Sequence, residues 1–478
     1  MAQTAIHTDP SPAVSGSAPT AQRRAFAAAF ILVNVLLAGY FLDSIPSPNP
    51  TSRVLPVLAL FEDGTYAIDR YEDTTMDKSF IAGHFYSDKA PLSTWLVLPV
   101  YGLLKLAGLP AADVFYFKWL PVAFIGGVLC GTVPFVVLVW LIARRLERDA
   151  PSANAVLLSM LPLYGSFVAA YSGVFVSHLL AGILLTGSYV LLKSGRRPAV
   201  CGFLVGLAVV AEYPAALALP VWAIFILRRQ PRALPRFVLG GLPCAAALLL
   251  YNYAITGSPL TNPYDYVAHD AFAEMKSAYG VRLPSLTAMW GLLFSPFRGL
   301  LFYAPALAVA AYAYLTARRR QLLSDAISPL GLLTIGYLAL ISSYFVWWGG
   351  WSYGPRHLIP LAMILFYEGV PLVAKRRSLH APLIWASIAG ILMVWVAKAT
   401  VLHIMPENYA NPVFDLALPK LLQGELRSDA VVTRLFGFHP IVAAPMWIVL
   451  FLASIKRLHA MTLRRREPVP AVLVESHA

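Results

Sequence analysis

Long apolar runs constrain the fold of this sequence more than any other feature. Residues 25–42, 326–345 and 381–401 each have close to the roughly 20 apolar residues that cross a bilayer core as a helix. A helix satisfies every backbone hydrogen bond within one segment, as hydrocarbon surroundings require. Hydrophobic residues make up 58% of the 478 residues and charged residues 13%, which is too little polar surface for a soluble globule of this size. The sequence therefore predicts an all-α, polytopic integral membrane protein.

Basic residues indicate which loops face the cytoplasm. The net charge of +13 is carried by short Lys and Arg clusters between apolar runs, which is the pattern of cytoplasmic loops. No basic face with interleaved aromatic residues accompanies them, so nucleic acid is not an expected partner. We expect a protein of the cytoplasmic (inner) membrane, embedded in membrane lipids, with about 12 or 13 membrane segments between residues 25 and 457.

Both ends of the chain are expected on the cytoplasmic side. Residues 1–24 are predicted to be a disordered N-terminus and residues 458–478 a basic tail. Two cytoplasmic ends require an even number of crossings, so one of about thirteen apolar segments should not cross fully. Residues 92–107 are one candidate, and the other is the stretch around Glu212, where a carboxylate and Pro214 indicate a broken helix. The segments expected to face outward are residues 43–90, 256–297, 346–355 and 404–440.

The first outward segment is the most acidic part of the chain. It holds eight of the 24 acidic residues between residues 43 and 90. Residues 54–61 are apolar and Gly64 suits a helix stop, so we expect a helix on the membrane surface. Carboxylates beside Lys78 and Lys89 could deprotonate a hydroxyl while the ammonium groups hold a phosphate leaving group. The alternative is an ordinary hydrated loop.

Three short motifs carry a resemblance to a known class of enzyme. They are Phe85-Tyr86-Ser87-Asp88-Lys89-Ala90-Pro91-Leu92, Ser295-Pro296-Phe297-Arg298-Gly299-Leu300-Leu301 and Trp347-Trp348-Gly349-Gly350-Trp351-Ser352-Tyr353-Gly354-Pro355-Arg356. Together they resemble GT-C glycosyltransferases, specifically a bacterial family-39-like branch related to protein O-mannosyltransferases and the aminoarabinose transferase of lipid A. The resemblance implies a GT-C fold, a polyprenyl-phosphate sugar as donor and an active site on the outer side.

The resemblance also implies roles for particular residues. Lys89 takes the place of the lysine that contacts the donor phosphate, and a carboxylate of the first loop serves as base. Where the class has an Asp-Glu pair at the start of the surface helix, this chain has Ser52-Arg53. Another carboxylate must therefore act as base, or the activity is lost.

Three aspartates of the first loop are our candidates for that base. Asp69 and Asp77 are each followed by a cation, Arg70 and Lys78, and an adjacent cation keeps a carboxylate ionised, as a base requires. Asp43 is the third candidate. Lys78 joins Lys89 as a predicted contact of the donor phosphate. The other candidate substrate contacts in this loop are His84, Tyr86 and Asp88.

Further candidates come from the later outward segments. Arg298 and Arg356 lie where these segments re-enter the bilayer, and an arginine can bind phosphate through two parallel hydrogen bonds. Trp348 and Trp351 offer aromatic faces for a sugar, although an interfacial belt of aromatic residues is the alternative. Glu212 should face the protein interior and have a partner, where it could bind substrate or order the broken helix. The remaining candidate substrate contacts are Tyr264 and His357.

Neither a metal nor a cofactor is predicted, because the histidines have no partner at metal-ligand spacing. The expected function is transfer of a sugar from a polyprenyl-phosphate carrier to an envelope glycan, lipid or protein at the outer face, with inversion. One alternative is a transporter or flippase for a lipid-linked or anionic substrate, which would use Glu212 and the arginines as a binding path. Another is a catalytically inactive GT-C-like scaffold, which Ser52-Arg53 would explain.

Overall fold

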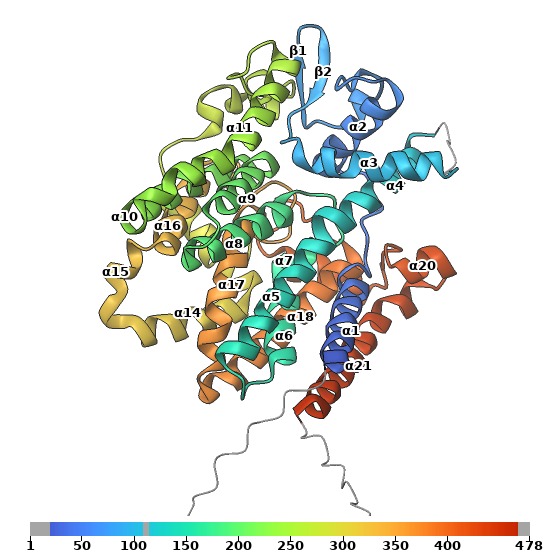
Figure 1. Ribbon diagram of the computed structural model, residues 1–478. Coiled ribbons are helices and arrows are strands. Elements are labelled where there is room, and N and C mark those ends of the chain that lie inside the picture. The colour runs from blue at the N-terminus through green and yellow to red at the C-terminus, as the bar shows by residue number, and fades with distance from the viewer. Residues whose placement is uncertain (1–19, 109–113, 467–478) are drawn as a thin grey trace, which may run out of the picture.

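The molecule is an assembly of helices with one small hairpin. The computed structural model describes residues 20–108 and 114–466, and Figure 1 shows the hairpin at the top of the molecule, above the helices. Within the described residues the only sheet pairs β1 (Lys78–Ile81) with β2 (His84–Ser87). The all-α fold expected from the sequence is confirmed. The expectations for residues 1–19 and 467–478 fall outside the described residues.

The helices of the first half of the chain are α1 (Thr20–Ala38), α2 (Pro48–Glu62), α3 (Leu92–Leu106), α4 (Phe115–Gly126), α5 (Val133–Asp149), α6 (Ala155–Tyr164), α7 (Phe167–Ala170), α8 (His178–Ser194), α9 (Pro198–Ala211), α10 (Ala218–Arg229) and α11 (Leu234–Thr256). Those of the second half are α12 (Leu286–Leu293), α13 (Leu300–Tyr303), α14 (Pro305–Arg318), α15 (Leu322–Ala326), α16 (Pro329–Ser343), α17 (Ile359–Ala374), α18 (His380–Thr400), α19 (Leu418–Leu422), α20 (Val431–Phe436) and α21 (Pro440–Arg466). Short 3-10 helices include η1 (Asp69–Thr74), η3 (Tyr213–Leu217), η5 (Pro263–Tyr266) and η9 (Arg356–Leu358), and η2 (Gly127–Thr132) is a π-helix.

Six helical stretches of the described residues are long and apolar enough to cross a membrane. They are Ala21–Ala38, Phe115–Asp149, Pro231–Thr256, Arg356–Ala374, Arg377–Thr400 and Pro440–Arg464. Five shorter apolar helices accompany them, namely α3, α6, α8, α9 and α16. The chain is therefore that of a multi-pass membrane protein, and the expectation of about 12 or 13 segments stays a prediction.

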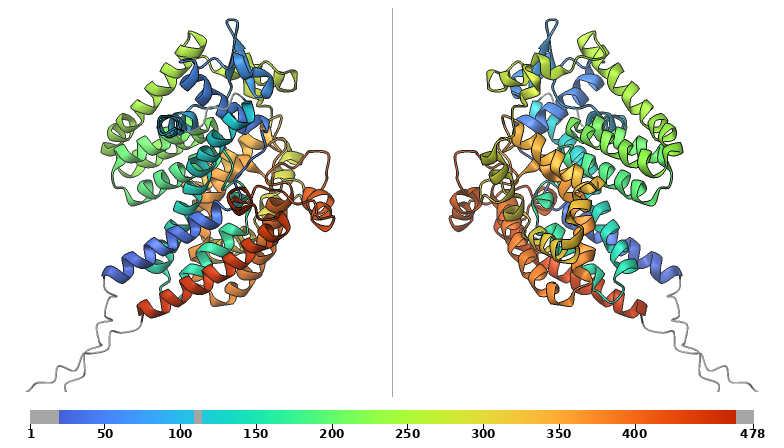
Figure 2. Two further views of the ribbon diagram at one scale, coloured as in Figure 1. Left: turned by 90° about the vertical axis from the view of Figure 1, so that its right-hand side faces the viewer. Right: turned by 90° about the vertical axis from the view of Figure 1, so that its left-hand side faces the viewer.

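The first and last helices lie side by side, as Figures 1 and 2 both show. The indole N–H of Trp447 in α21 donates to the Leu37 carbonyl of α1 at 2.9 Å. The hydroxyl of Tyr40, just after α1, donates to the Ala443 carbonyl at 2.8 Å. The first residues of α1 and the last residues of α21 consequently lie at the same end of the molecule, away from the hairpin. This placement agrees with the expectation that both chain ends share one side.

The helix predicted to break at Glu212 is broken there. Helix α9 ends at Ala211, Glu212 has an extended backbone with φ −150°, and η3 follows before α10 begins. Pro214 lacks the amide hydrogen that would continue the hydrogen bonding of α9. The break leaves the Glu212 side chain inside the protein, between two apolar helices.

The surface helix predicted in the first loop is α2, and it ends before Gly64 as expected. Gly64 has φ +68°, a conformation that suits glycine. Residues 50–59 of α2 are all buried, because the helix packs against α3 and α4 and below the hairpin strand β2. The helix is therefore covered by protein rather than lying open on a membrane surface.

Hydrogen bonds of the hairpin connect the first outward loop to the second. Strands β1 and β2 pair in antiparallel register, from Lys78 opposite Ser87 to Ile81 opposite His84. The turn between them, at Ala82 and Gly83, has positive φ angles. The Ala268 amide donates to the Lys78 carbonyl at 2.9 Å. The Ser79 hydroxyl donates to the Pro263 carbonyl at 2.6 Å. Residues 43–90 and 256–297 thus form one connected structure.

Glycines let the chain between α7 and α8 approach the α4–α5 helix closely. A Cβ atom on Gly127 would lie 2.6 Å from the Gly173 carbonyl oxygen, and one on Gly131 would lie 2.8 Å from that of Tyr171. Both glycines belong to the π-helix η2, an irregularity that often marks functional sites. This contact fixes the segment that leads into Ser177, at the start of α8.

We expect Gly127→Ala to destabilise the protein, because the added Cβ meets backbone that cannot move aside. The expected cost is about 1–3 kcal/mol, as for other overpacked sites. The matched control is Gly336→Ala in α16, where the nearest atoms would be Leu217 methyl groups at 3.8 Å or more. There the better helix propensity of alanine should leave stability unchanged or increase it. Thermal unfolding in detergent measures both, and equal melting temperatures for the two variants would contradict the close contact at η2.

Candidate functional site

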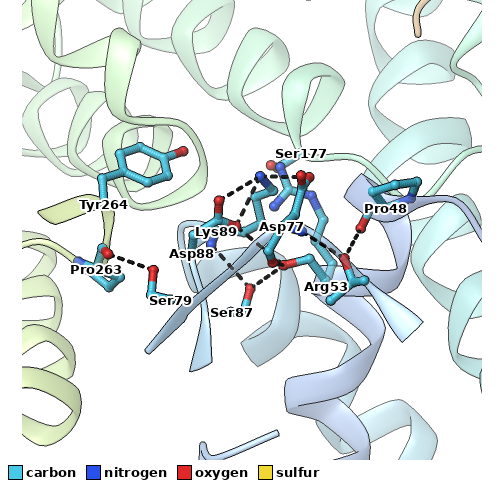
Figure 3. A network of polar contacts seen from close by, with 12 residues as sticks. Pro48, Arg53, Asp77, Ser79, Ser87, Asp88, Lys89, Ser177, Pro263 and Tyr264 are labelled. Atoms are coloured by element: carbon cyan, nitrogen blue, oxygen red, sulfur yellow. Dashed lines mark hydrogen bonds and ion pairs between the residues drawn. The ribbon is translucent and has the colours of Figure 1, made fainter. Parts of the chain in front are cut away.

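A buried charged cluster lies beneath the hairpin, with Lys89 at its centre. The Lys89 ammonium lies 2.9 Å from a carboxylate oxygen of Asp77 and 3.0 Å from one of Asp88. Figure 3 shows Lys89 between these two carboxylates. Asp77 and Asp88 are almost fully buried, at 6% and 1% exposure, so the charges must neutralise one another. The sequence prediction that Lys89 and Asp88 belong to one site is consistent with this arrangement, as is the inclusion of Asp77.

Opposite charges in this cluster stabilise the ionised forms of their neighbours. Burial alone would lower the pKa of Lys89, but the carboxylates of Asp77 and Asp88 outweigh it and raise the pKa. Lys89 therefore remains an ammonium. Burial raises the pKa of Asp88, against the opposing attraction of Lys89. Asp88 thus holds its proton more readily than an exposed aspartate does.

Ser52 and Arg53 both point into this cluster from α2. The Ser52 hydroxyl donates to the Asp77 carbonyl oxygen at 2.6 Å and shares a hydrogen bond with the Ser87 hydroxyl at 2.8 Å. The Arg53 guanidinium lies 3.0 Å from a carboxylate oxygen of Glu212. The two residues that replace the acidic pair of the resembled class therefore lie within the site.

Glu212 has the interior partners expected of a buried carboxylate. Besides Arg53, it accepts a hydrogen bond from the Ser177 hydroxyl at 2.5 Å. His178 Nδ1 lies 3.2 Å from the same carboxylate. The sequence had given no partner for Glu212. His178 could have been suspected as a partner because it is a histidine at the start of an otherwise apolar segment. Arg53 could have been suspected because a buried carboxylate needs a cation.

Arg356 and His357 border the cluster from a third outward segment. The rings of His178 and His357 are 5.7 Å apart, and that of Tyr344 packs on His357 from the other side at 5.9 Å. Arg356 acts electrostatically on both His178 and His357. The site therefore combines the first loop with η9 and the start of α8.

Several nitrogen atoms of this site are buried without a hydrogen-bond partner among the described residues. They are Nε and Nη1 of Arg53 and Nε of Arg356. Buried donors are almost always paired in native proteins, because an unpaired one costs about 1–3 kcal/mol. A set of such donors in one place indicates a binding site for an acceptor-rich group.

Tyr264 lies at the edge of the cluster, on the second outward loop. Figure 3 shows its ring beside the carboxylates, above Pro263 and Ser79. It packs against Tyr213, the residue after Glu212, with 5.6 Å between ring centres. Its predicted role as a substrate contact remains a prediction.

Three predicted residues lie apart from Lys89: Asp69 begins η1, and Lys78 and His84 are the first residues of β1 and β2. Asp69 is 43% exposed and lies 2.7 Å from the His84 ring nitrogen. It also accepts a hydrogen bond from the Phe85 amide at 2.6 Å. Slight burial favours the neutral form, but these two hydrogen bonds outweigh it and lower the pKa of Asp69. Lys78 pairs with Glu72 and lies 4.8 Å from the centre of the Phe85 ring. The structure therefore does not bring Asp69, His84 and Lys78 to Lys89.

Tyr86, on β2, packs with Ile81 and Tyr251.

Arg298 occupies a different place from the one expected of a phosphate contact. It is fully buried and donates to the carbonyl oxygens of Phe297 at 2.8 Å, Gly350 at 3.1 Å and Met405 at 2.9 Å. Three outward segments are joined by this one side chain.

Trp348 donates to Glu407 at 2.5 Å on the exposed rim of these segments, and Trp351 is 59% exposed.

Asp43 belongs to a second buried cluster that the sequence did not predict. Its carboxylate lies 3.7 Å from the Arg427 guanidinium and 3.9 Å from the His403 ring. Arg427 also pairs with Asp429, which accepts a hydrogen bond from the Ser44 amide at 3.2 Å. Burial, only partly offset by Arg427, raises the pKa of Asp43 to about 7. This cluster joins the start of the first loop to the last outward segment.

The described residues contain no group of three or more His, Cys, Asp or Glu side chains that could hold a metal ion. The expectation that the site works without a metal or cofactor stays a prediction.

The apolar helices and the buried charged site define a multi-pass helical membrane protein with a polar centre beneath its first outward loop. The chain matches no protein-family model, and no curated protein sequence matches it. In structure, 94% of the chain is similar to ArnT from Cupriavidus metallidurans in the apo state, with 14% identity, a TM-score of 0.47 and 78% of ArnT covered. The form of ArnT bound to undecaprenyl phosphate gives 15% identity, a TM-score of 0.48, and coverage of 94% of this chain and 79% of ArnT.

The arabinosyltransferase EmbB from Mycobacterium smegmatis is also similar. The likeness covers 97% of this chain and 43% of EmbB, with 14% identity and a TM-score of 0.41. These likenesses concern the course of the chain, and none of them assigns a role to a side chain.

We expect the contribution of Asp43 to the stability of the protein to fall as pH rises from about 4 to about 7. Asp43 has a folded pKa of about 7 against 3.8 in its ordinary state, so in this window the folded chain binds a proton that the unfolded chain has lost. The stabilisation is complete below about pH 4 and lost above about pH 7. Asp43→Asn should remove this dependence, which is on the order of a few kcal/mol.

Melting temperatures measured from pH 4.5 to 8 for wild type and Asp43→Asn test this expectation. The control is Asp73→Asn, at an exposed position of the same loop, which should follow the wild-type profile. A profile of Asp43→Asn parallel to that of wild type would show that Asp43 is ionised throughout.

Proposed function

We propose that the protein is a membrane glycosyltransferase that moves a sugar from a polyprenyl-phosphate carrier to an acceptor of the cell envelope, with inversion. The observation that carries the proposal is the set of unpaired buried donors on Arg53 and Arg356 beside the Lys89 ammonium. A phosphate offers several acceptor oxygens and a charge that these donors match. The resemblance of the first-loop motif around Lys89 points to the same class of donor.

The charge balance of the site suits reversible binding of a phosphate. Lys89 has two carboxylate partners, Asp77 and Asp88, and Arg53 has one, Glu212. A phosphate that approaches Lys89 can take the place of Asp77, which leaves the Asp77 carboxylate free to accept a proton. The free edge of the Arg53 guanidinium can then donate to the same phosphate while the other edge keeps Glu212.

Asp77 is our choice for the base. Of the three aspartates considered from the sequence, it alone contacts Lys89, whereas Asp69 lies on the exposed side of the hairpin and Asp43 in the second cluster. Asp88 is the more deeply buried partner of Lys89 and lies 3.4 Å from the Ser52 hydroxyl. We assign Asp88 to orienting Lys89.

The proposed reaction is a single displacement. Asp77, freed from Lys89 by the phosphate, accepts the proton of an acceptor hydroxyl as its oxygen attacks the anomeric carbon. The bond from this carbon to the phosphate oxygen breaks as the new glycosidic bond forms, which inverts the anomeric centre. Lys89, Arg53 and Arg356 stabilise the charge that develops on the departing polyprenyl phosphate.

The acceptor is proposed to be an envelope glycan, lipid or protein that reaches the site from the outer side of the cytoplasmic membrane. Trp351 and Trp348 form the exposed rim on that side, and Figure 3 shows Tyr264 above Pro263 on the second loop, to the left of Asp88. Aromatic rings suit the apolar faces of sugars. These residues are the proposed acceptor contacts.

We expect Asp77→Asn to lower the rate of sugar transfer by about 10²–10⁴-fold, the usual contribution of a general base. Asparagine has nearly the same shape but cannot take the proton, so binding of polyprenyl phosphate should persist. Purified protein incubated with labelled polyprenyl-phosphate sugars and envelope extracts provides the assay. Asp69→Asn is the matched control from the same loop and should keep activity within about twofold.

Full activity of Asp77→Asn would rule out this base, and loss of activity in Asp43→Asn instead would assign the role to the second cluster. Binding of polyprenyl phosphate by the wild type without any transfer would support the inactive scaffold. Movement of labelled lipid across vesicles without transfer would support the transporter.

We expect Arg53→Lys to weaken binding of polyprenyl phosphate roughly 10-fold. Lysine keeps the charge beside Glu212 but cannot donate to Glu212 and phosphate from two edges, and one lost charge-assisted bond of about 1.4 kcal/mol is tenfold in affinity. Arg282→Lys is the matched control, because Arg282 is 62% exposed and pairs with Glu274 on the second loop. Equal dissociation constants for the two variants, measured by microscale thermophoresis, would exclude Arg53 from the phosphate site.

A further inference from the structure

A second pocket lies at the far ends of α8, α9 and α10, away from the charged cluster. It has a volume of about 100 Å³, several times the roughly 30 Å³ that a water molecule takes up in the liquid. Its wall combines cations with apolar side chains. Its lining includes Lys193, Arg196, Arg229, Leu191, Phe225 and Ile226.

The cations around this pocket are largely without acidic partners. Within the described residues, no ion pair involves any arginine from residue 196 to residue 236. These arginines are Arg196, Arg197, Arg228, Arg229, Arg232 and Arg236. The sequence explains this, because no acidic residue other than Glu212 occurs between Asp149 and Asp265. Lys193 alone has a partner, Glu368 at 2.8 Å.

Some other basic helix ends of the same protein have acidic partners, whereas Arg319 and Arg320 have none among the described residues. Arg144 pairs with Glu147 at 2.8 Å and Arg148 with Asp149 at 2.9 Å. Arg318 pairs with Asp325 at 2.6 Å. The arginines that line the pocket therefore carry positive charge that no acidic side chain of the described residues balances, and an anion from outside the chain would supply that balance.

The apolar half of the pocket indicates what kind of anion fits. Phe225 and Ile226 belong to the last turns of α10, and Leu191 to those of α8. The Arg229 guanidinium lies 4.4 Å from the centre of the Phe225 ring, which holds it at the boundary between the apolar helix and the basic turn. An occupant must meet cations on one side and hydrocarbon on the other.

We propose that this pocket binds the phosphate headgroup of an anionic phospholipid from the leaflet that surrounds these helix ends. The headgroup phosphate would lie between Arg196, Arg229 and Lys193, and the first part of an acyl chain would lie along Phe225 and Ile226. Basic pockets between membrane helices are known to select anionic headgroups by this combination of charge and depth. The site is independent of the proposed sugar transfer.

Binding of phosphatidylglycerol to the full-length protein tests the proposal. Native mass spectrometry and thermal shift in a neutral detergent measure retention of phosphatidylglycerol, with phosphatidylcholine as the uncharged comparison. We expect at least about tenfold tighter retention of phosphatidylglycerol by the wild type, equivalent to about 1.4 kcal/mol. The double variant Arg196→Gln with Arg229→Gln should lose this preference.

Two further variants separate the pocket from a general attraction of charges. Arg319→Gln with Arg320→Gln removes two exposed arginines outside the pocket and should keep the preference. Ala233→Phe fills the pocket, which Ala233 helps to line, without changing any charge, and it should lose the preference. Retention by Ala233→Phe, or equal losses in both double variants, would overturn the pocket assignment.

The remaining outcomes concern the source of the anion. Stabilisation by inorganic phosphate equal to that by phosphatidylglycerol would assign the pocket to a free anion and overturn the lipid. Equal retention of phosphatidylcholine would overturn selection by charge. Melting temperatures without added lipid confirm that each variant is folded, as expected for side chains at exposed turns.

Discussion

The buried ion pair between Arg53 and Glu212 is the interaction on which the rest of the site depends. It joins α2 of the first loop to the break between α9 and η3, which lies 159 residues further along the chain. Removing one partner of such a pair leaves an uncompensated buried charge, which typically costs about 3–5 kcal/mol. The pair fixes the position of α2, and Ser52 beside it then holds the Asp77 backbone and the Ser87 hydroxyl. The geometry around Lys89 follows from there.

The outward segments are connected to one another by a few polar contacts. The hairpin binds the second loop through Lys78 and Ser79. Arg298 joins its own segment to Gly350 and Met405, and the cluster of Asp43 and Asp429 joins the two ends of the chain's outward structure. The side of the molecule that carries the candidate site is therefore one continuous cap over the helices.

Local sequence patterns predicted those features that depend on local physics. Apolar runs gave the helical membrane class, Gly64 the end of α2, and Glu212 with Pro214 the broken helix. Partners far apart in sequence were not predictable, because no spacing rule relates Arg53 to Glu212 or Asp43 to Arg427. Arg298 shows the same difficulty: its motif suggested a phosphate contact, but Nη1 and Nη2 of its guanidinium donate to three backbone carbonyls. Asp69 has the adjacent cation expected of a base, yet it stabilises the hairpin through His84 and Phe85.

The contact between β1 and the second loop has a consequence for how this site can change. Asp77 immediately precedes β1, and the Lys78 carbonyl and Ser79 hydroxyl are bound to residues 263–268. The loop that would meet an acceptor is thus part of the support of the proposed base. The second outward loop therefore cannot be replaced without affecting the site. A loop replacement that altered its backbone path would misplace Asp77 even if every charged residue were kept. Under the proposed function, acceptor range and the position of the base therefore depend on the same loop backbone.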